Sequence, residues 1–178
     1  DRVSLRKIDR SDTSALFEMF SHAEVMRYWS RPAMTDKAQA DALFEQVLAD
    51  YETGNSLPLA IERDSDRAFV GNCTLHHFHE ASRRAEIGYC LARPYWGMGY
   101  MHEALQTLLA YAFERLHLNR LEADIDPRNT SSARSLRRLD RHHPRAVLGV
   151  HPGRVPGRYR GPALPPVRGH RHGGGRDL

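Results

Sequence analysis

A glycine turn between a strand-like segment and a long amphipathic segment constrains this chain more than any other feature. Residues 85–91 alternate between two kinds of side chain, which is the pattern of a strand with two distinct faces. Residues 94–100 follow and contain Gly97 and Gly99, which allow a tight turn and a close backbone approach to a ligand. Residues 100–116 then repeat apolar side chains at helical spacing. The chain should therefore pass from strand to helix through a turn that is open to a ligand.

Such a turn favours an anionic ligand, because the first amides of the helix and the positive end of its dipole face the same place. Phosphate groups commonly bind there. The turn is not a P-loop, since no Gly-Lys-Ser/Thr follows it, and the third glycine of a dinucleotide fingerprint is replaced by His102. A lone Gly-x-Gly also fits an ordinary tight turn, so the turn alone leaves the ligand open.

The residues around the turn carry a more specific resemblance. The run Trp-Gly-x-Gly-Tyr-x-x-Glu-Ala-Leu at residues 96–105 resembles the acetyl-coenzyme A (acetyl-CoA) signature of the GNAT N-acetyltransferases. Residues 5–8 and 24–29 resemble the start of the RimJ/RimL-type branch, which includes ribosomal-protein N-terminal acetyltransferases. The resemblance covers residues 3–139. It implies an enzyme that moves acetyl from acetyl-CoA to a primary amine, either a protein N-terminus or a small molecule, by direct attack.

The other segments predict an α+β fold with a mostly antiparallel mixed sheet flanked by helices. The expected strands are residues 3–8, 57–62, 68–77, 85–91 and 120–126, and the expected helices are residues 16–20, 23–28, 35–51, 100–116 and 129–139. Thr35 is the expected N-cap of the third helix. This order matches the first five sheet strands of the GNAT (acyl-CoA N-acyltransferase) fold. The last two strands of that fold are not found.

The end of the chain has a different composition. Residues 141–178 hold eight of the 13 glycines and six of the ten prolines, and they show no strand or helix periodicity. We therefore divide the chain into a GNAT domain at residues 1–139 and an Arg/Pro/Gly-rich tail at residues 140–178. The tail composition is typical of disorder, and it is also what GC-rich DNA encodes in a shifted reading frame. Without its last strands, the chain could alternatively be a catalytically impaired GNAT-like domain.

The net charge of +4 is unevenly distributed, because the tail carries about +7 and the rest of the chain about −3. Nucleic-acid binding would therefore depend on the tail, whose one aromatic residue is Tyr159, and it is the least favoured function. No apolar run is long enough to cross a membrane, no signal peptide is recognisable, and two cysteines make no disulfide framework. These features predict a cytoplasmic enzyme without a membrane partner. An uncovered sheet edge would allow a homodimer.

The resemblance implies which residues bind acetyl-CoA. The pyrophosphate is expected against the backbone of the turn: Trp96, Gly97, Met98, Gly99 and Tyr100. The pantetheine and the thioester carbonyl are expected along the strand that enters the turn, which in the family splays from its neighbour: Tyr89, Cys90 and Leu91. Met98 departs from the family, because Lys or Arg is usual at this position.

A second match lies at the start of the last helix. In the family, residues corresponding to Asn129 and Ser132 contact the cofactor. A local interpretation is also open, because an Asn at this place can cap the helix and Ser can lie in its first turn. Both interpretations can hold, since the N-terminus of this helix is expected to face the ligand.

Amide formation needs a neutral amine, so a base must accept the amine proton. Glu86, on the strand that enters the turn, is the predicted base. The alternative is an exposed strand glutamate paired with Arg83 or Arg84. The family often has a Tyr near the end of the last helix as general acid, and this chain has none there.

The sequence predicts no metal site. His76, His77 and His79 are close in the chain, but alternation along a strand would place neighbouring side chains on opposite faces. Cys73 and Cys90 lack a flanking base signature, so packing is favoured over nucleophilic catalysis for both.

Overall fold

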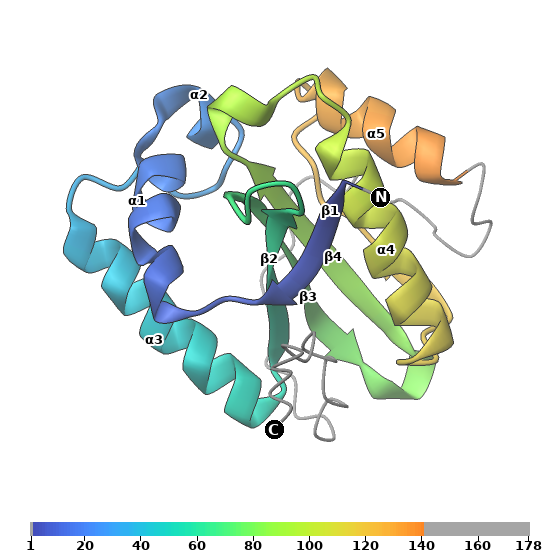
Figure 1. Cartoon of the computed structure of the whole chain (residues 1–178). Helices are drawn as coiled ribbons and strands as arrows, with labels where there is room; N and C mark the ends of the chain where they lie inside the picture. Colours follow the sequence, from blue (N-terminus) through green and yellow to red (C-terminus); the bar gives the residue numbers. More distant parts are fainter. Residues whose placement is uncertain (1, 141–178) are drawn as a thin grey trace, which may run out of the picture.

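The computed structural model describes residues 2–140, and these form a five-stranded sheet with helices on both faces (Figure 1). The strands are β1 (Val3–Lys7), β2 (Ser56–Arg63), β3 (Phe69–His79), β4 (Arg84–Leu91) and β5 (Arg120–Glu122). The helices are α1 (Thr13–Ser21), α2 (Ala23–Met26), α3 (Lys37–Thr53), α4 (Tyr100–Glu114) and α5 (Thr130–Asp140), with short 3-10 turns η1 (Arg10–Asp12), η2 (Glu80–Ser82) and η3 (Arg93–Tyr95). This order confirms the predicted α+β architecture. The expectations for the tail lie outside the described residues.

The sheet has the spatial order β1-β2-β3-β4-β5, and its first four strands are antiparallel to their neighbours. The pair β4–β5 is parallel, because α4 carries the chain back across the sheet before β5 begins. This ladder is short and runs from Arg84–Arg120 to Glu86–Glu122. The mixed, mostly antiparallel sheet is thus confirmed. Its parallel pair includes β4, the strand that leads into the glycine turn.

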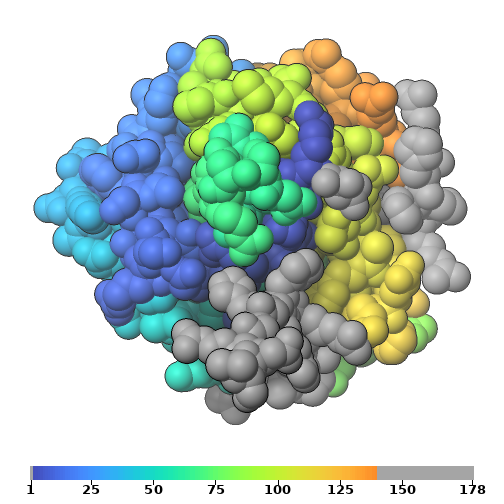
Figure 2. Space-filling view, viewed as in Figure 1, coloured from blue at the N-terminus to red at the C-terminus, as the bar shows by residue number. Residues whose placement is uncertain are grey.

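Two hydrophobic cores lie on the two faces of the sheet. Helices α4 and α5 cover one face, where Leu105, Leu108 and Ile87 of β4 belong to the same core. Helices α1, α2 and α3 cover the other, where Phe20 lies in the same core as Cys90 of β4. Figure 2 shows the N-terminal segment and α3 along one flank of the molecule and α4 with α5 along the other. Strand β4 therefore contributes to both cores and lies between the two halves.

Two local predictions need correction. The N-cap of α3 is Asp36, not Thr35, because the Asp36 carboxylate accepts the Ala38 N–H at 2.8 Å and Gln39 completes a capping box. Strand β5 ends at Glu122, four residues before the predicted end, although Ala123 is still buried.

None of the helices within residues 2–140 is both long and apolar enough to cross a lipid bilayer.

A buried ionic network fixes β1 against β2 and η1. The Arg6 guanidinium donates to both carboxylate oxygens of Asp12, at 2.7 and 2.8 Å, and also to Glu62. Both acids are 4% exposed, and Arg67 reaches Glu62 from the other side at 2.8 Å. Two buried negative charges are thus neutralised by two arginines, and the Asp12 pair is bidentate, as strong pairs commonly are.

Candidate cofactor and acceptor site

The pairing of β4 with β5 stops before the end of β4. The last pair of the ladder joins Glu86 to Glu122, whereas β4 continues to Leu91. Residues 87–91 therefore run beyond the parallel ladder, on the edge of β4 that faces away from β3. This is the opening that the resemblance led us to expect between these two strands. A ligand with an extended, hydrogen-bonding chain could bind along such a strand.

The glycine turn has the backbone that the sequence predicts. Gly97 has φ of +76° and Gly99 has φ of +86°, a left-handed region that glycine adopts without steric cost. A Cβ atom added at Gly97 would meet nothing within 4 Å, so open space lies in front of this residue. Gly99 is the N-cap of α4 and offers no side-chain acceptor to the first amides of the helix. Those amides can therefore serve an anion.

A cavity of about 460 Å³ lies between the end of β4, the glycine turn and α5. Its lining includes eight of the ten predicted cofactor residues: Tyr89, Cys90, Leu91, Trp96, Gly97, Gly99, Asn129 and Ser132. They come from three separate segments of the chain. The structure thus brings together in one place residues that the sequence singled out independently.

Two of the predicted cofactor residues lie elsewhere in the turn. The Met98 side chain is 48% exposed, and its carbonyl accepts a hydrogen bond from Arg2 at 2.9 Å. The Tyr100 ring is buried, 6.4 Å from the Tyr95 ring and 4.9 Å from the Arg2 guanidinium. Neither residue lines the cavity.

The turn is tied to the strand that precedes it. The Trp96 indole N–H donates to the Leu91 carbonyl at 2.8 Å, and the Arg93 guanidinium lies 4.8 Å from the centre of the Trp96 ring. Arg93 also pairs with Glu24 of α2, at 2.7 Å, and this hydrogen bond lowers the pKa of the Glu24 carboxyl. These contacts connect the turn to both halves of the molecule.

The start of α5 has the helix cap that the sequence suggested, and the capping residues also line the cavity. The Asn129 side-chain oxygen accepts the Ser132 N–H at 3.1 Å, which is a helix cap. The Ser132 hydroxyl in turn lies 2.5 Å from the Tyr89 hydroxyl of β4. Burial raises the pKa of Tyr89 to about 12, so its hydroxyl stays protonated and available as a donor. Asn129 and Ser132 cap the helix and also line the cavity.

Several lining residues were not identified from the sequence. Glu24, Tyr28 and Trp29 border the cavity on the α2 side, and Arg134 and Arg138 border it from α5. The two arginines are four residues apart and therefore share one face of the helix. This spacing was the available signal, but the sequence alone does not show which face of α5 is turned to the cavity.

Glu86 lies on β4 three residues before Tyr89 and is not among the cavity-lining residues. Its carboxylate lies 2.9 Å from His77 Nδ1. The predicted alternative, pairing with Arg83 or Arg84, is wrong for Arg84, which pairs with Glu122 at 3.1 Å. The assignment of Glu86 as the base stays a prediction.

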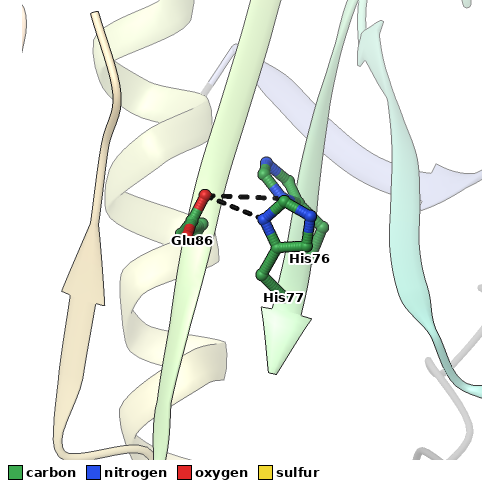
Figure 3. Close-up of side chains that lie close together, drawn as sticks. All are labelled: His76, His77 and Glu86. Atoms are coloured by element: carbon green, nitrogen blue, oxygen red, sulfur yellow. Dashed lines mark hydrogen bonds and ion pairs between the residues drawn. The ribbon is translucent and has the colours of Figure 1, made fainter. Parts of the chain in front are cut away.

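The predicted alternation of the three histidines fails at His77. The β3–β4 register shifts between His76 and His79, and His77 has φ of +47°, so the strand is bulged there. The His76 and His77 rings consequently lie side by side, with their Nδ1 atoms 3.1 Å apart (Figure 3). Burial is the main cause that lowers the pKa of His76 below 6.5. His79 is separate and bonds to Ser82.

Neither cysteine is a credible nucleophile. Cys73 and Cys90 are both free and buried. Burial raises the pKa of each thiol to about 12, so both stay protonated near neutral pH. Cys90 lines the cavity and belongs to the core beneath α1, α2 and α3.

The comparisons with known proteins agree with this geometry. Residues 2–141 match the family model described as the acetyltransferase (GNAT) domain. The protein named uncharacterized N-acetyltransferase p20 of Bacillus licheniformis is 34% identical over 139 residues, which are 78% of each chain. An acetyltransferase of the GNAT family from Bacillus anthracis has a similar structure, with a TM-score of 0.68, 25% identity, and coverage of 78% of this chain and 79% of that one.

A more distant structure shows the same fold with a ligand. Spermidine N-acetyltransferase from Vibrio cholerae, solved in complex with CoA and spermine, has a TM-score of 0.69 at 18% identity, with coverage of 77% of this chain and 79% of that one. At this identity the likeness concerns the fold alone. With the family match and the p20 relative, the sequence and the structure lead to one conclusion: the chain belongs to the GNAT family of acetyl-CoA-dependent acetyltransferases.

Proposed function

We propose that this protein transfers the acetyl group of acetyl-CoA to a primary amine by direct attack, with both substrates bound together. The observation that carries the proposal is the cavity at the open end of β4. It joins the free strand edge, the glycine turn and the start of α5, and it extends to the residues after α2. Such a cavity has room for a cofactor on one side and an acceptor on the other.

The cofactor side suits the charge of coenzyme A. The pyrophosphate would bind the amides of Gly97 and Gly99 and the N-terminus of α4, where the helix dipole favours an anion. Arg134 and Arg138 add two positive charges from α5. The pantetheine would then extend along residues 87–91, which continue past the β4–β5 ladder.

The acceptor side is formed by the residues around α2. Tyr28 and Trp29 present aromatic surfaces to the cavity, and such surfaces attract a cationic amine before it loses its proton. A protein N-terminus, the acceptor implied by the RimJ/RimL-type resemblance, suits direct attack well. Its α-amine has an ordinary pKa of about 7.7–8.0, whereas that of a Lys amine is about 10.4, so much more of it is neutral near pH 7. A small amine, as in the Vibrio cholerae neighbour, is the other acceptor class.

The chemistry forms one bond and breaks another. The amine nitrogen bonds to the thioester carbon, the carbon–sulfur bond breaks, and the thiolate of CoA leaves. The amine proton passes to a base, and Glu86 is the proposed acceptor of that proton. Because Glu86 lies outside the cavity lining, a water molecule would relay the proton to it.

The binding half of the proposal is tested by thermal unfolding with acetyl-CoA. A ligand that binds only the folded protein must raise its melting temperature. Gly97→Asp and Gly97→Asn form a matched pair, because both side chains tolerate a left-handed φ and differ mainly in charge. Acetyl-CoA should stabilise the Asn variant and should stabilise the Asp variant far less, since the new carboxylate repels the pyrophosphate.

An equal shift in the two variants would show that the phosphates bind elsewhere, and no shift in the wild-type protein would overturn the proposal. A normal shift without acetyl transfer to any amine would instead indicate the impaired GNAT-like domain that the sequence left open.

A further inference from the structure

Two histidines lie against Glu86, and acetyl transfer explains neither of them. His76 and His77 come from β3, and Glu86 comes from the neighbouring strand β4 (Figure 3). One ligand-type atom from each residue lies within 4.8 Å of the other two. The cluster does not line the cofactor cavity.

The backbone is shaped to bring the two imidazoles together. In a regular strand, adjacent side chains point to opposite faces. Here the register shift after His76 and the φ of +47° at His77 place both rings on the side of Glu86. A left-handed φ is unusual for a residue other than glycine and carries a conformational cost, so such a position deserves a functional explanation.

Ordinary hydrogen bonds within the cluster cannot satisfy both contacts of His77 Nδ1 at once. His77 Nδ1 lies 3.1 Å from His76 Nδ1 and 2.9 Å from a Glu86 oxygen. In a neutral imidazole this nitrogen either carries a proton or offers a lone pair, but not both. It can therefore donate to Glu86 or accept from His76, and one of the two contacts is left without its hydrogen bond. A single cation between the three atoms would satisfy all of them.

The distances suit a small transition-metal ion. In tetrahedral zinc sites the bonds to nitrogen and oxygen are about 2.0–2.2 Å, which places ligand atoms about 3.3 Å apart. The three separations here are 3.1, 2.9 and 4.0 Å and lie on both sides of that value. Two imidazoles and one carboxylate are also a set of ligands that zinc uses in proteins when one coordination position stays open.

We propose that His76, His77 and Glu86 bind a divalent transition-metal ion of the zinc class, with the fourth coordination position open to solvent. The three side chains are 30%, 35% and 31% exposed, so an ion can reach them from solution. The site joins the bulged end of β3 to β4. Bound metal would hold the two strands together and would occupy the carboxylate of the proposed base.

The test uses the full chain and Co²⁺, whose visible absorption distinguishes tetrahedral from octahedral sites, with Zn²⁺ calorimetry alongside. We expect a tetrahedral Co²⁺ spectrum that Zn²⁺ abolishes. Changes to groups that only support metal ligands cost tenfold to about 100-fold in affinity, so losing a ligand should cost at least about 100-fold. His77→Asn is the sharpest variant, because Asn tolerates the left-handed φ at this position.

Two controls separate this site from other histidines. His79→Ala removes the third histidine of β3, which bonds to Ser82 instead, and should leave the spectrum unchanged. His170→Ala/His172→Ala removes a histidine pair near the end of the chain and should also leave the tetrahedral band unchanged. Loss of the band in either control would overturn the proposal.

The other outcomes are equally decisive. Wild-type affinity in His77→Asn, or a weak octahedral spectrum in the wild-type protein, would contradict the site. If His77→Asn fails to fold, Glu86→Gln replaces it, because it leaves the bulge intact while weakening one ligand. None of these measurements requires acetyl transfer, so failure of the metal proposal is distinguishable from failure of the proposed function. The two proposals share only Glu86, which cannot act as the base while it binds the metal.

Discussion

At the scale of single residues, the surroundings of Glu86 define what it can do. Its carboxylate contacts His77 at 2.9 Å and is 31% exposed, so it keeps access to water. A base that works through a water molecule needs that access. It does not need a place in the cavity wall, and Glu86 has none.

Replacing Glu86 therefore tests catalysis separately from cofactor binding. If Glu86 is the base, Glu86→Gln should lower kcat by about 100-fold to 10,000-fold, the usual contribution of general base catalysis. The melting shift with acetyl-CoA should stay unchanged, because Glu86 is outside the cavity. Glu114→Gln, at the exposed end of α4, is the control. A kcat within twofold of the wild-type value would assign the base to another group.

A second residue-scale prediction concerns stability. Arg6→Ala would leave Asp12 and Glu62, each 4% exposed, without their shared partner. Breaking a buried pair in this way typically costs about 3–5 kcal/mol, so the free energy of unfolding should fall by about that amount. Urea unfolding measures it.

Arg10→Ala is the matched control, because the pair of Arg10 and Glu45 is 66% and 60% exposed and should contribute less than about 1 kcal/mol. Equal losses of unfolding free energy in the two variants would show that burial does not increase the contribution of the Arg6 network to stability.

At the scale of elements, the site depends on how closely β3 approaches β4. A Cβ atom added at Gly71 of β3 would overlap the carbonyl oxygen of Cys90, so glycine is required for this approach. Cys90 lines the cavity at the open end of β4. The contact therefore sets where the cofactor edge of β4 lies.

Gly71→Ala should push the two strands apart and lower stability by about 1–3 kcal/mol, the usual cost of overpacking. The affinity for acetyl-CoA should fall with it. Gly88→Ala provides the comparison within β4, because its Cβ would meet His76 Nε2 at an ordinary 3.5 Å. Titration calorimetry and thermal unfolding of both variants measure the two effects. Equal changes of stability and of acetyl-CoA affinity in the two variants would contradict the packing argument.

The elements also show what sequence patterns can and cannot predict. Apolar periodicity is local, so it predicted the order of strands and helices, and the motif at residues 96–105 marked a turn that lines the cavity. The contact between His76 and His77 could not be predicted, because one bulged residue reverses the expected alternation. The contribution of Arg134 and Arg138 also depends on how α5 is rotated against the sheet, which is a matter of tertiary packing.

At the scale of the whole molecule, the two cores meet along β4, and the cavity opens where they meet. The cavity is lined by Glu24, Val25, Tyr28 and Trp29, in and just after α2, and by residues of α4 and α5. In the proposed function, two substrates would approach one thioester from different halves of the fold. This arrangement is suited to direct attack and needs no acyl-enzyme, which agrees with two thiols held protonated by burial.

The most direct test of this account is the initial rate of CoA release at varied concentrations of both acetyl-CoA and an acceptor amine. A peptide with a free N-terminus and spermidine represent the two acceptor classes. We predict release that requires an amine, with intersecting double-reciprocal lines, and a large loss of rate in Gly97→Asp but not in Gly97→Asn. Parallel lines would indicate an acyl-enzyme, and release that is independent of any amine would contradict transfer to an amine.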